Sequence, residues 1–148
     1  MADGGKKKKV SSYLSRLPNY ERTNFDKSLE TNTPYQTKIW NRGDTVSVRA
    51  IGHISPEQFK QSYKPNIYHT DWDKLDLHPD FQTSVDYPID DLVSSMKEHG
   101  VVKPVIAFRQ NGMISDGHHR AFAAIKAGVD IPVVHFTEDF PTIKGKDD

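Results

Sequence analysis

The chain has 148 residues, about the length of one domain, and it contains no cysteine, which excludes disulfides, thiolate catalysis and cysteine-ligated zinc. Hydrophobic residues make up only 35% of the chain, so we expect a compact core in part of it rather than throughout. No apolar stretch approaches the roughly 20 residues that span a bilayer, and no apolar block follows the N-terminal lysines. The sequence therefore predicts a cytoplasmic protein with no membrane partner.

The charge is unevenly distributed, because residues 1–43 carry nine Lys or Arg against four Asp or Glu although the formal net charge of the chain is zero. Residues 6–9 are four consecutive lysines, and no apolar period runs through the segment. Residues 1–43 therefore predict a basic, polar N-terminal arm that is extended and largely irregular. The arm is either solvated or contacts nucleic acid or an acidic protein surface. Its apolar residues favour docking on a protein: Tyr13, Leu14, Leu17, Tyr20, Tyr35, Ile39 and Trp40.

Residues 44–83 predict short elements in an otherwise irregular region. Residues 46–51 alternate apolar and polar side chains, as a half-buried strand does, and Ser55-Pro56 is typical of a helix start. Residues 68–80 are rich in aromatic, histidine and aspartate side chains, the last two of which can ligate a divalent metal. No periodicity places them on one face, so the sequence favours a polar loop held by aromatic residues and no metal site.

Residues 84–138 show a regular pattern that predicts a small α/β or α+β unit, followed by a charged tail over 139–148. Asn111-Gly112 is a hairpin signal inside this unit, and glycine follows each of the two helical segments. The expected elements are a helix that ends before Gly100, a buried strand over 101–108, a short strand at 113–114, a helix over 121–127 and a strand over 132–136.

A polar loop over residues 115–120, Ser-Asp-Gly-His-His-Arg, joins the hairpin strand to the second helix and is the candidate site. The N-terminus of a helix attracts anions, Gly117 lets a ligand approach the backbone, and Arg120 can grip a phosphate. His118 and His119 can donate hydrogen bonds and exchange protons near neutral pH, and Asp116 can orient a histidine or accept a proton. The alternative to a ligand site is a purely structural loop, in which Asp-Gly forms a turn and His-His-Arg is a polar helix start. Neither common nucleotide-binding glycine fingerprint is present.

The order and spacing of four motifs resemble the ParB/sulfiredoxin superfamily. The resemblance extends over about residues 84–136 and is closest to small stand-alone ParB-like proteins of phages and mobile elements, which are often described as nucleases. It implies a fold with a small mixed sheet and helices. It also implies that the protein is located in the host cytoplasm or, for a phage protein, in the virion. The four motifs are Pro88–Leu92, Gly100–Ile106, Asp116–Ala121 and Pro132–Val133.

The resemblance implies nucleotide binding at the polar loop. ParB proteins bind and hydrolyse CTP, sulfiredoxins use ATP, and a related group phosphorylates free serine, with the phosphates against this loop in each case. Gly117 and Arg120 match the phosphate-binding glycine and arginine. His118 stands where sulfiredoxin has its catalytic cysteine and ParB commonly has glutamate, and His119 stands at a sulfiredoxin histidine and a ParB arginine. The missing cysteine excludes sulfiredoxin chemistry, and a helix-turn-helix domain has no room after Phe136, which argues against a partition clamp.

Two functions follow as expectations. The first is a protein that binds ATP or CTP, with Mg²⁺, and acts as a nucleotidase, kinase or nuclease. Its catalytic residues would be Asp116, His118 and His119, and its nucleotide contacts would be residues 117–120. The second is a non-catalytic ParB-like module that docks on a protein assembly, for example a phage particle, or on nucleic acid through the arm. The first predicts a nucleotide-sized pocket at Gly117, whereas the second predicts a filled loop.

Overall fold

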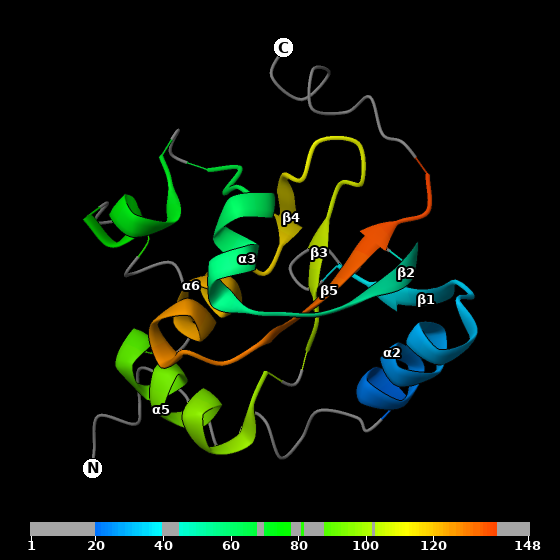
Figure 1. Ribbon diagram of the computed structural model, residues 1–148, viewed down its shortest axis with the longest axis horizontal. Helices are drawn as coiled ribbons and strands as arrows, with labels where there is room; N and C mark the ends of the chain where they lie inside the picture. Colours follow the sequence, from blue (N-terminus) through cyan, green and yellow to red (C-terminus); the bar gives the residue numbers. More distant parts are fainter. Residues whose placement is uncertain are drawn as a thin grey trace.

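The computed structural model describes residues 20–39, 45–67, 70–77, 81, 88–101 and 103–138, which form one mixed sheet with helices on both faces (Figure 1). The described helices are α2 (Tyr20–Thr31), α3 (Pro56–Ser62), α5 (Ile89–His99) and α6 (His118–Ala127), with a 3₁₀ helix, η2, at Trp72–Leu77. The described strands are β1 (Tyr35–Lys38), β2 (Thr45–Ile54), β3 (Val105–Ala107), β4 (Ile114–Asp116) and β5 (Ile131–Phe136).

The sheet has the strand order β1-β2-β5-β3-β4. β3 and β5 are parallel, and the other three pairings are antiparallel. The chain runs from β3 to its parallel partner β5 through β4, at the edge of the sheet, and α6. The expected site lies in this connection, between β4 and α6. The expected α/β (α+β) fold with a small mixed sheet is confirmed.

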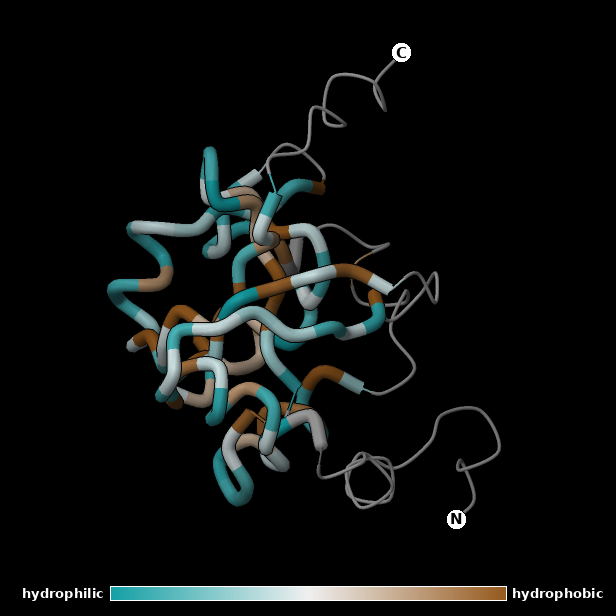
Figure 2. The backbone as a smooth tube through the Cα atoms, turned by 90° about the vertical axis from the view of Figure 1, so that its right-hand side faces the viewer, coloured by the Kyte–Doolittle hydropathy of each residue, from teal (hydrophilic) through white to brown (hydrophobic). Residues whose placement is uncertain are grey.

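One face of the sheet is covered by α3, α5 and α6, and the main core lies beneath them. The small side chains of Ala121, Ala123 and Ala124 are fully buried, which brings α6 close to the sheet and to α5. Phe59, Trp72 and other large side chains fill the rest of this core. Figure 2 shows apolar segments concentrated towards the middle of the molecule and hydrophilic segments along much of its outline.

The opposite face of the sheet carries α2 and a second core. Phe25 of α2 packs there against a group of sheet residues that includes Ile39, Val48, Ala50 and Val134. Ser28 is also buried: its hydroxyl donates to the Thr33 carbonyl at 2.5 Å and accepts the Ala50 N–H at 2.9 Å. Ala50 adjoins a bulge in the β2–β5 pairing, so Ser28 supplies an acceptor where the ladder is irregular.

These elements differ from the irregular arm expected over 1–43, since residues 20–31 form a helix and residues 35–38 join the sheet. The sequence of α2 has too few apolar residues at helical spacing to predict this helix, because its buried residues are Phe25 and Ser28. Ile39 is buried in the second core and Tyr35 packs half-buried against it, so both contribute to folding. Residues 1–19, Trp40 and the tail over 139–148 lie outside the described residues.

The middle region is also more regular than expected. β2 is ten residues long and lies between β1 and β5, so a single sheet joins all three of the expected segments 1–43, 44–83 and 84–138. Ser55 caps α3 as expected, because its hydroxyl accepts the Gln58 N–H at 3.3 Å. Trp72 is buried and donates from Nε1 to the Tyr63 carbonyl at 2.8 Å.

The hairpin strands differ from expectation in length. β3 covers only 105–107, because Pro104 has no N–H to donate to a ladder. β4 continues to Asp116, which pairs with Ile106, and α6 begins at His118. The polar loop expected over 115–120 is therefore reduced to Gly117 alone. No helix in the described part of the chain is long and apolar enough to cross a membrane.

Candidate functional site

The junction between β4 and α6 is a sharp turn at Gly117. This residue is the N-cap of α6, with φ 105° and ψ 25°, a conformation that L side chains rarely adopt. The Ala121 N–H is the first to bond back, to the Gly117 carbonyl at 2.8 Å, so the preceding N–H groups of the first turn have no partner inside the helix. No side chain caps the helix and no acidic residue lies in its first turn. The start of α6 therefore presents a positive dipole end.

Arg120 folds back over this turn instead of projecting from it. Its Nη2 donates to the Pro104 carbonyl at 3.0 Å and lies 3.5 Å from Oδ2 of Asp116. A Cβ placed on Gly117 would lie 2.8 Å from the same Nη2, so the guanidinium fills the space above the glycine. Nε of Arg120 is buried and has no hydrogen-bond partner. The site thus holds a mostly buried cation with an unused donor.

His118 is held as a neutral acceptor. Its Nε2 accepts the backbone N–H of Asn66 at 3.0 Å, which requires an unprotonated Nε2. The pKa of His118 is lowered to about 4, chiefly by burial and next by the charge of His119; Asp116 raises it and Arg120 lowers it by smaller amounts. The proton exchange near neutral pH that the sequence predicts for His118 is therefore not supported by its surroundings.

His119 lies against Phe81. The two rings are parallel within 7°, with centroids 4.1 Å apart, and Nε2 of His119 donates to the Phe81 carbonyl at 2.8 Å. Phe81 is fully buried, so this contact ties the first turn of α6 to a core residue far away in the sequence. The structure thus brings all five predicted residues, 116–120, to one junction, where the two histidines are held by backbone groups of other segments.

Sequence reasoning missed the partners Asn66, Phe81 and Pro104. Each offers a backbone N–H or carbonyl to the junction, a group that carries no residue-type signal, and Phe81 also stacks its ring on His119. Within the part of the chain that the structure describes, no group of three His, Asp or Glu side chains is placed to hold a metal ion. Several residues of the aromatic and acidic segment, including Tyr68 and His69, lie outside the described residues.

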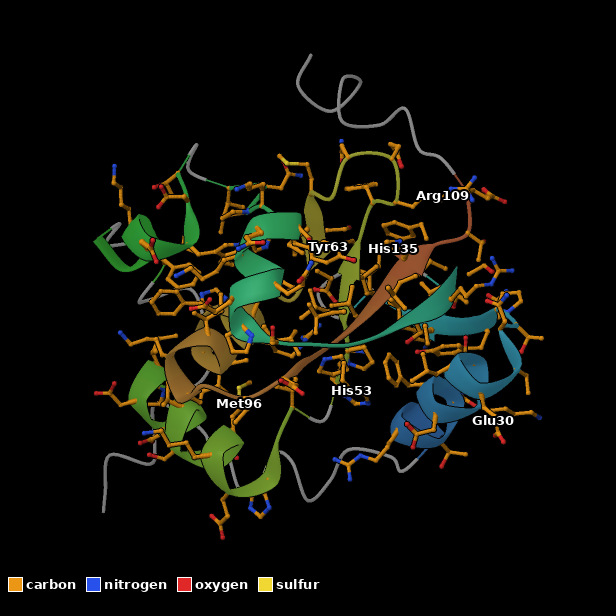
Figure 3. The ribbon with its side chains drawn as sticks, viewed as in Figure 1. Glu30, His53, Tyr63, Met96, Arg109 and His135 are labelled. Atoms are coloured by element: carbon orange, nitrogen blue, oxygen red, sulfur yellow. The ribbon has the colours of Figure 1, made fainter. Side chains whose placement is uncertain are left out.

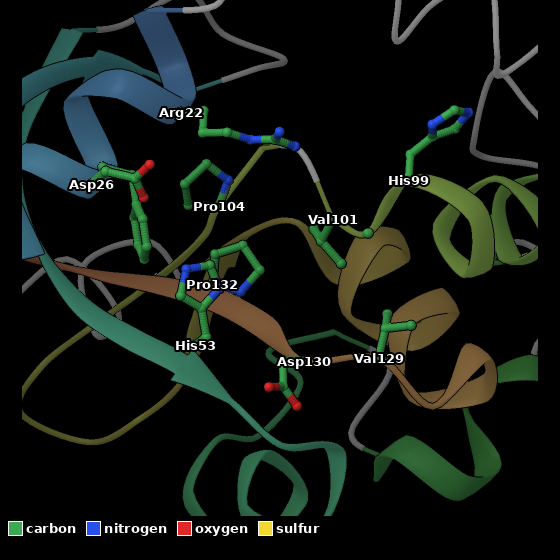
Figure 4. Close-up of a pocket in the computed structure, with 11 residues that line it drawn as sticks. Arg22, Asp26, His53, His99, Val101, Pro104, Val129, Asp130 and Pro132 are labelled. Atoms are coloured by element: carbon green, nitrogen blue, oxygen red, sulfur yellow. The ribbon is translucent and has the colours of Figure 1, made fainter.

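A cavity of about 420 Å³ lies elsewhere, between α2, the C-terminal end of α5 and the start of β5 (Figure 4). Its walls include the apolar residues Phe25, Val101 and Pro132, with charged groups such as Asp26 and Asp130 at its edges. None of residues 116–120 lines it. At Gly117 itself the guanidinium of Arg120 fills the space over the turn, which is the filled loop expected of a non-catalytic module and not the open nucleotide-sized pocket expected of an enzyme.

Comparison with known proteins gives a similarity of fold. No protein-family model matches the chain. No curated protein matches it either. Among solved structures, the chain is similar to a Pnob8-like ParB-N domain crystallised in a C2221 form, with a TM-score of 0.40 and 22% sequence identity. The match covers 68% of this chain and 34% of the other, so it spans about a third of that structure.

Proposed function

We propose that this chain binds a nucleoside triphosphate, ATP or CTP, at the β4–α6 junction. The observation that carries the proposal is the buried, unpartnered Nε of Arg120, which lies over Gly117 at the uncapped start of α6. A buried donor without an acceptor costs about 1–3 kcal/mol, and a phosphate oxygen is a charged acceptor of suitable geometry. The dipole of α6 acts on the same anion.

Arg120 can turn towards a phosphate because its present contacts are weak or replaceable. Its distance of 3.5 Å to Asp116 exceeds the roughly 2.7–2.9 Å of a strong charge-assisted hydrogen bond. The other contact is a single bond to the Pro104 carbonyl. When the guanidinium turns, the space over Gly117 opens and the backbone of the turn becomes accessible to phosphate oxygens.

Mg²⁺ fits the proposal through Asp116. This carboxylate is buried at the end of β4, next to the position of the phosphates, and it would repel them without a cation between. A magnesium ion bound by one carboxylate and by phosphate oxygens is a common arrangement in nucleotide sites. Asp116 would hold the ion, which would neutralise phosphate charge, and nucleotide affinity should therefore require Mg²⁺.

The catalytic roles expected for His118 and His119 are not part of this proposal. Nε2 of His118 is occupied by the Asn66 N–H, and Nε2 of His119 is bonded to the Phe81 carbonyl. We assign both residues to holding the first turn of α6 in place for the nucleotide. Hydrolysis, phosphotransfer or nuclease activity would then depend on Asp116 or on a residue outside the described part of the chain.

Calorimetric titration of the full chain with ATP and CTP, with Mg²⁺ and with EDTA, tests the proposal. Arg120→Gln should weaken nucleotide binding at least about tenfold, as expected for loss of a charged phosphate contact. Lys126→Gln is the matched control, because it removes one positive charge from the exposed last turn of the same helix. Equal affinities of wild type and Arg120→Gln, or binding that EDTA leaves unchanged, would contradict the proposed site. Absence of any nucleotide binding would contradict the function.

A further inference from the structure

The cavity between α2 and α5 lies on the face of the sheet that carries the second core. In the pairing of β2 with β5, Ala50 lies opposite Val134 and His53 lies opposite Pro132, with a bulge between the two pairs. Val134 and Pro132 are two positions apart on β5, so their side chains share a face. The extra residue in β2 therefore brings His53 onto the same face as Ala50. Phe25 of α2 lines both the second core and the cavity, so the two adjoin each other.

The floor of the cavity is apolar. It is lined by Phe25, Val101, Pro104 and Pro132, and all four residues are buried. Their side chains carry no hydrogen-bonding group, so this part of the cavity favours an apolar group over a polar one. The volume of about 420 Å³ is close to the lower end of the roughly 300–1,000 Å³ of small-molecule sites. The cavity therefore suits a compact molecule with an apolar part.

The mouth of the cavity carries two opposite charges on α2. Arg22 and Asp26 both line the cavity, both are exposed, and they lie one helical turn apart. Opposite charges at this spacing commonly pair, yet within the part of the chain that the structure describes neither forms an ion pair. Figure 4 shows both side chains on the α2 side of the cavity, with Asp130 at the opposite edge. A cation and an anion without ion-pair partners thus lie next to each other above an apolar floor.

We propose that this cavity binds a free α-amino acid with an apolar side chain. The carboxylate and the ammonium group of an α-amino acid are attached to the same carbon, which matches two opposite charges one helical turn apart. Arg22 would hold the carboxylate through its guanidinium fork, and Asp26 would accept hydrogen bonds from the ammonium group. The side chain of the amino acid would enter the apolar floor, where its burial favours binding.

The paired charges favour a free amino acid over a segment of polypeptide. A residue inside a peptide has neither charge on its backbone, and a terminal residue has only one of them, so only the free amino acid can pair with both Arg22 and Asp26. None of residues 116–120 lines the cavity, so the site is separate from the proposed nucleotide site. Its α2 wall also lies outside residues 84–136, over which the family resemblance extends.

Calorimetric titration of the full chain with L-phenylalanine and L-leucine tests the site. Arg22→Gln and Asp26→Asn should each weaken binding at least about tenfold, as expected for loss of a charged hydrogen bond. Lys27→Gln and Glu30→Gln are the controls, because they remove one charge of each sign from exposed positions of α2 that do not line the cavity. Figure 3 shows Glu30 on the side of α2 that faces away from His53. The controls should change affinity less than about twofold, and unchanged affinity in Arg22→Gln or Asp26→Asn would overturn the proposal.

Blocked amino acids test the two charges on the wild-type chain, so the result does not depend on the folding of a variant. L-phenylalaninamide lacks the carboxylate and N-acetyl-L-phenylalanine lacks the ammonium group, and each should bind at least about tenfold more weakly than L-phenylalanine. L-serine should also bind at least about tenfold more weakly, because its side chain buries little apolar area. Equal affinity for any of these three probes would overturn the proposal, and so would absence of binding by both apolar amino acids. Arg22→Gln should bind ATP and CTP as wild type does, so the failure of either proposed site can be recognised without the other.

Discussion

The environment of His118 predicts a specific dependence of stability on pH. In the native state the pKa of His118 is about 4, whereas an unfolded chain has an ordinary histidine pKa of about 6.5. Between these values the unfolded state binds a proton that the native state does not, so the free energy of unfolding falls as the solution is acidified. The effect is absent above about pH 7, where both states are neutral, and it is complete below about pH 4.

The size of the effect follows from the same two values. The gap between about 4 and about 6.5, at roughly 1.4 kcal/mol per pH unit, corresponds to about 3 kcal/mol of unfolding free energy. Its physical source is first the burial of the ring and next the neighbouring charge of His119. Protonation of Nε2 would also break the hydrogen bond from the Asn66 N–H. The pKa of His135 is lowered as well, so the wild-type chain alone would not isolate His118.

Comparison with His118→Gln isolates it, because the glutamine amide keeps an acceptor for Asn66 but does not titrate. Equilibrium unfolding in urea would be followed for both proteins from about pH 7.5 to about pH 4.5. Wild type should lose about 2–3 kcal/mol more than the variant over this range. Parallel losses in the two proteins, or an NMR titration of the His118 ring with a midpoint near 6.5, would refute the reasoning.

Three further predictions concern the fold and the chemistry. Gly117→Ala and Gly128→Ala should each cost about 1–2 kcal/mol in urea unfolding, because both positions have positive φ (105° and 73°). The Cβ added at Gly117 meets only Nη2 of Arg120, at 2.8 Å, and this side chain can shift, so a loss at Gly117 that exceeds the loss at Gly128 by several kcal/mol would contradict the weak holding of Arg120. Phe25→Ala should cost about 3–5 kcal/mol, and a loss below about 1 kcal/mol would mean that α2 does not pack on the sheet. The purified protein should not reduce peroxiredoxin sulfinic acid, because the chain has no cysteine, and detection of that activity would sink the argument.

The parts of the fold that the sequence could predict are those with local signals. The start of α3 is predicted by Ser55 as its N-cap followed by proline. The ends of α5 and α6 are predicted by the glycine that follows each helix. The final strand is a nearly continuous apolar run, as expected for a strand that is buried on both faces. In each case the residues that determine the element lie within it or next to it.

The parts that the sequence could not predict depend on distant contacts. α2 shows little apolar period, and its place on the sheet depends on Phe25 and on Ser28, a polar residue that is buried because it bonds to Ala50 across 22 positions. The contacts of the candidate site also depend on residues that are distant in the sequence. Residues 116–120 could be named from their types, but the engagement of the two histidines could not, because their partners are backbone groups 52 and 38 positions away.

Arg49 and Arg120 connect these observations to function. Native chains satisfy nearly all of their buried donors, so two arginines whose buried Nε atoms lack acceptors are unusual within one small domain. At Arg120 an apolar side chain of similar length would avoid the unused donor but would lose the bond to the Pro104 carbonyl and the contact with Asp116. The two arginines lie on different elements, one on β2 and the other in the first turn of α6. An anion beside a guanidinium supplies the acceptor that such a buried donor lacks, and the nucleotide proposed at the start of α6 is an anion of this kind.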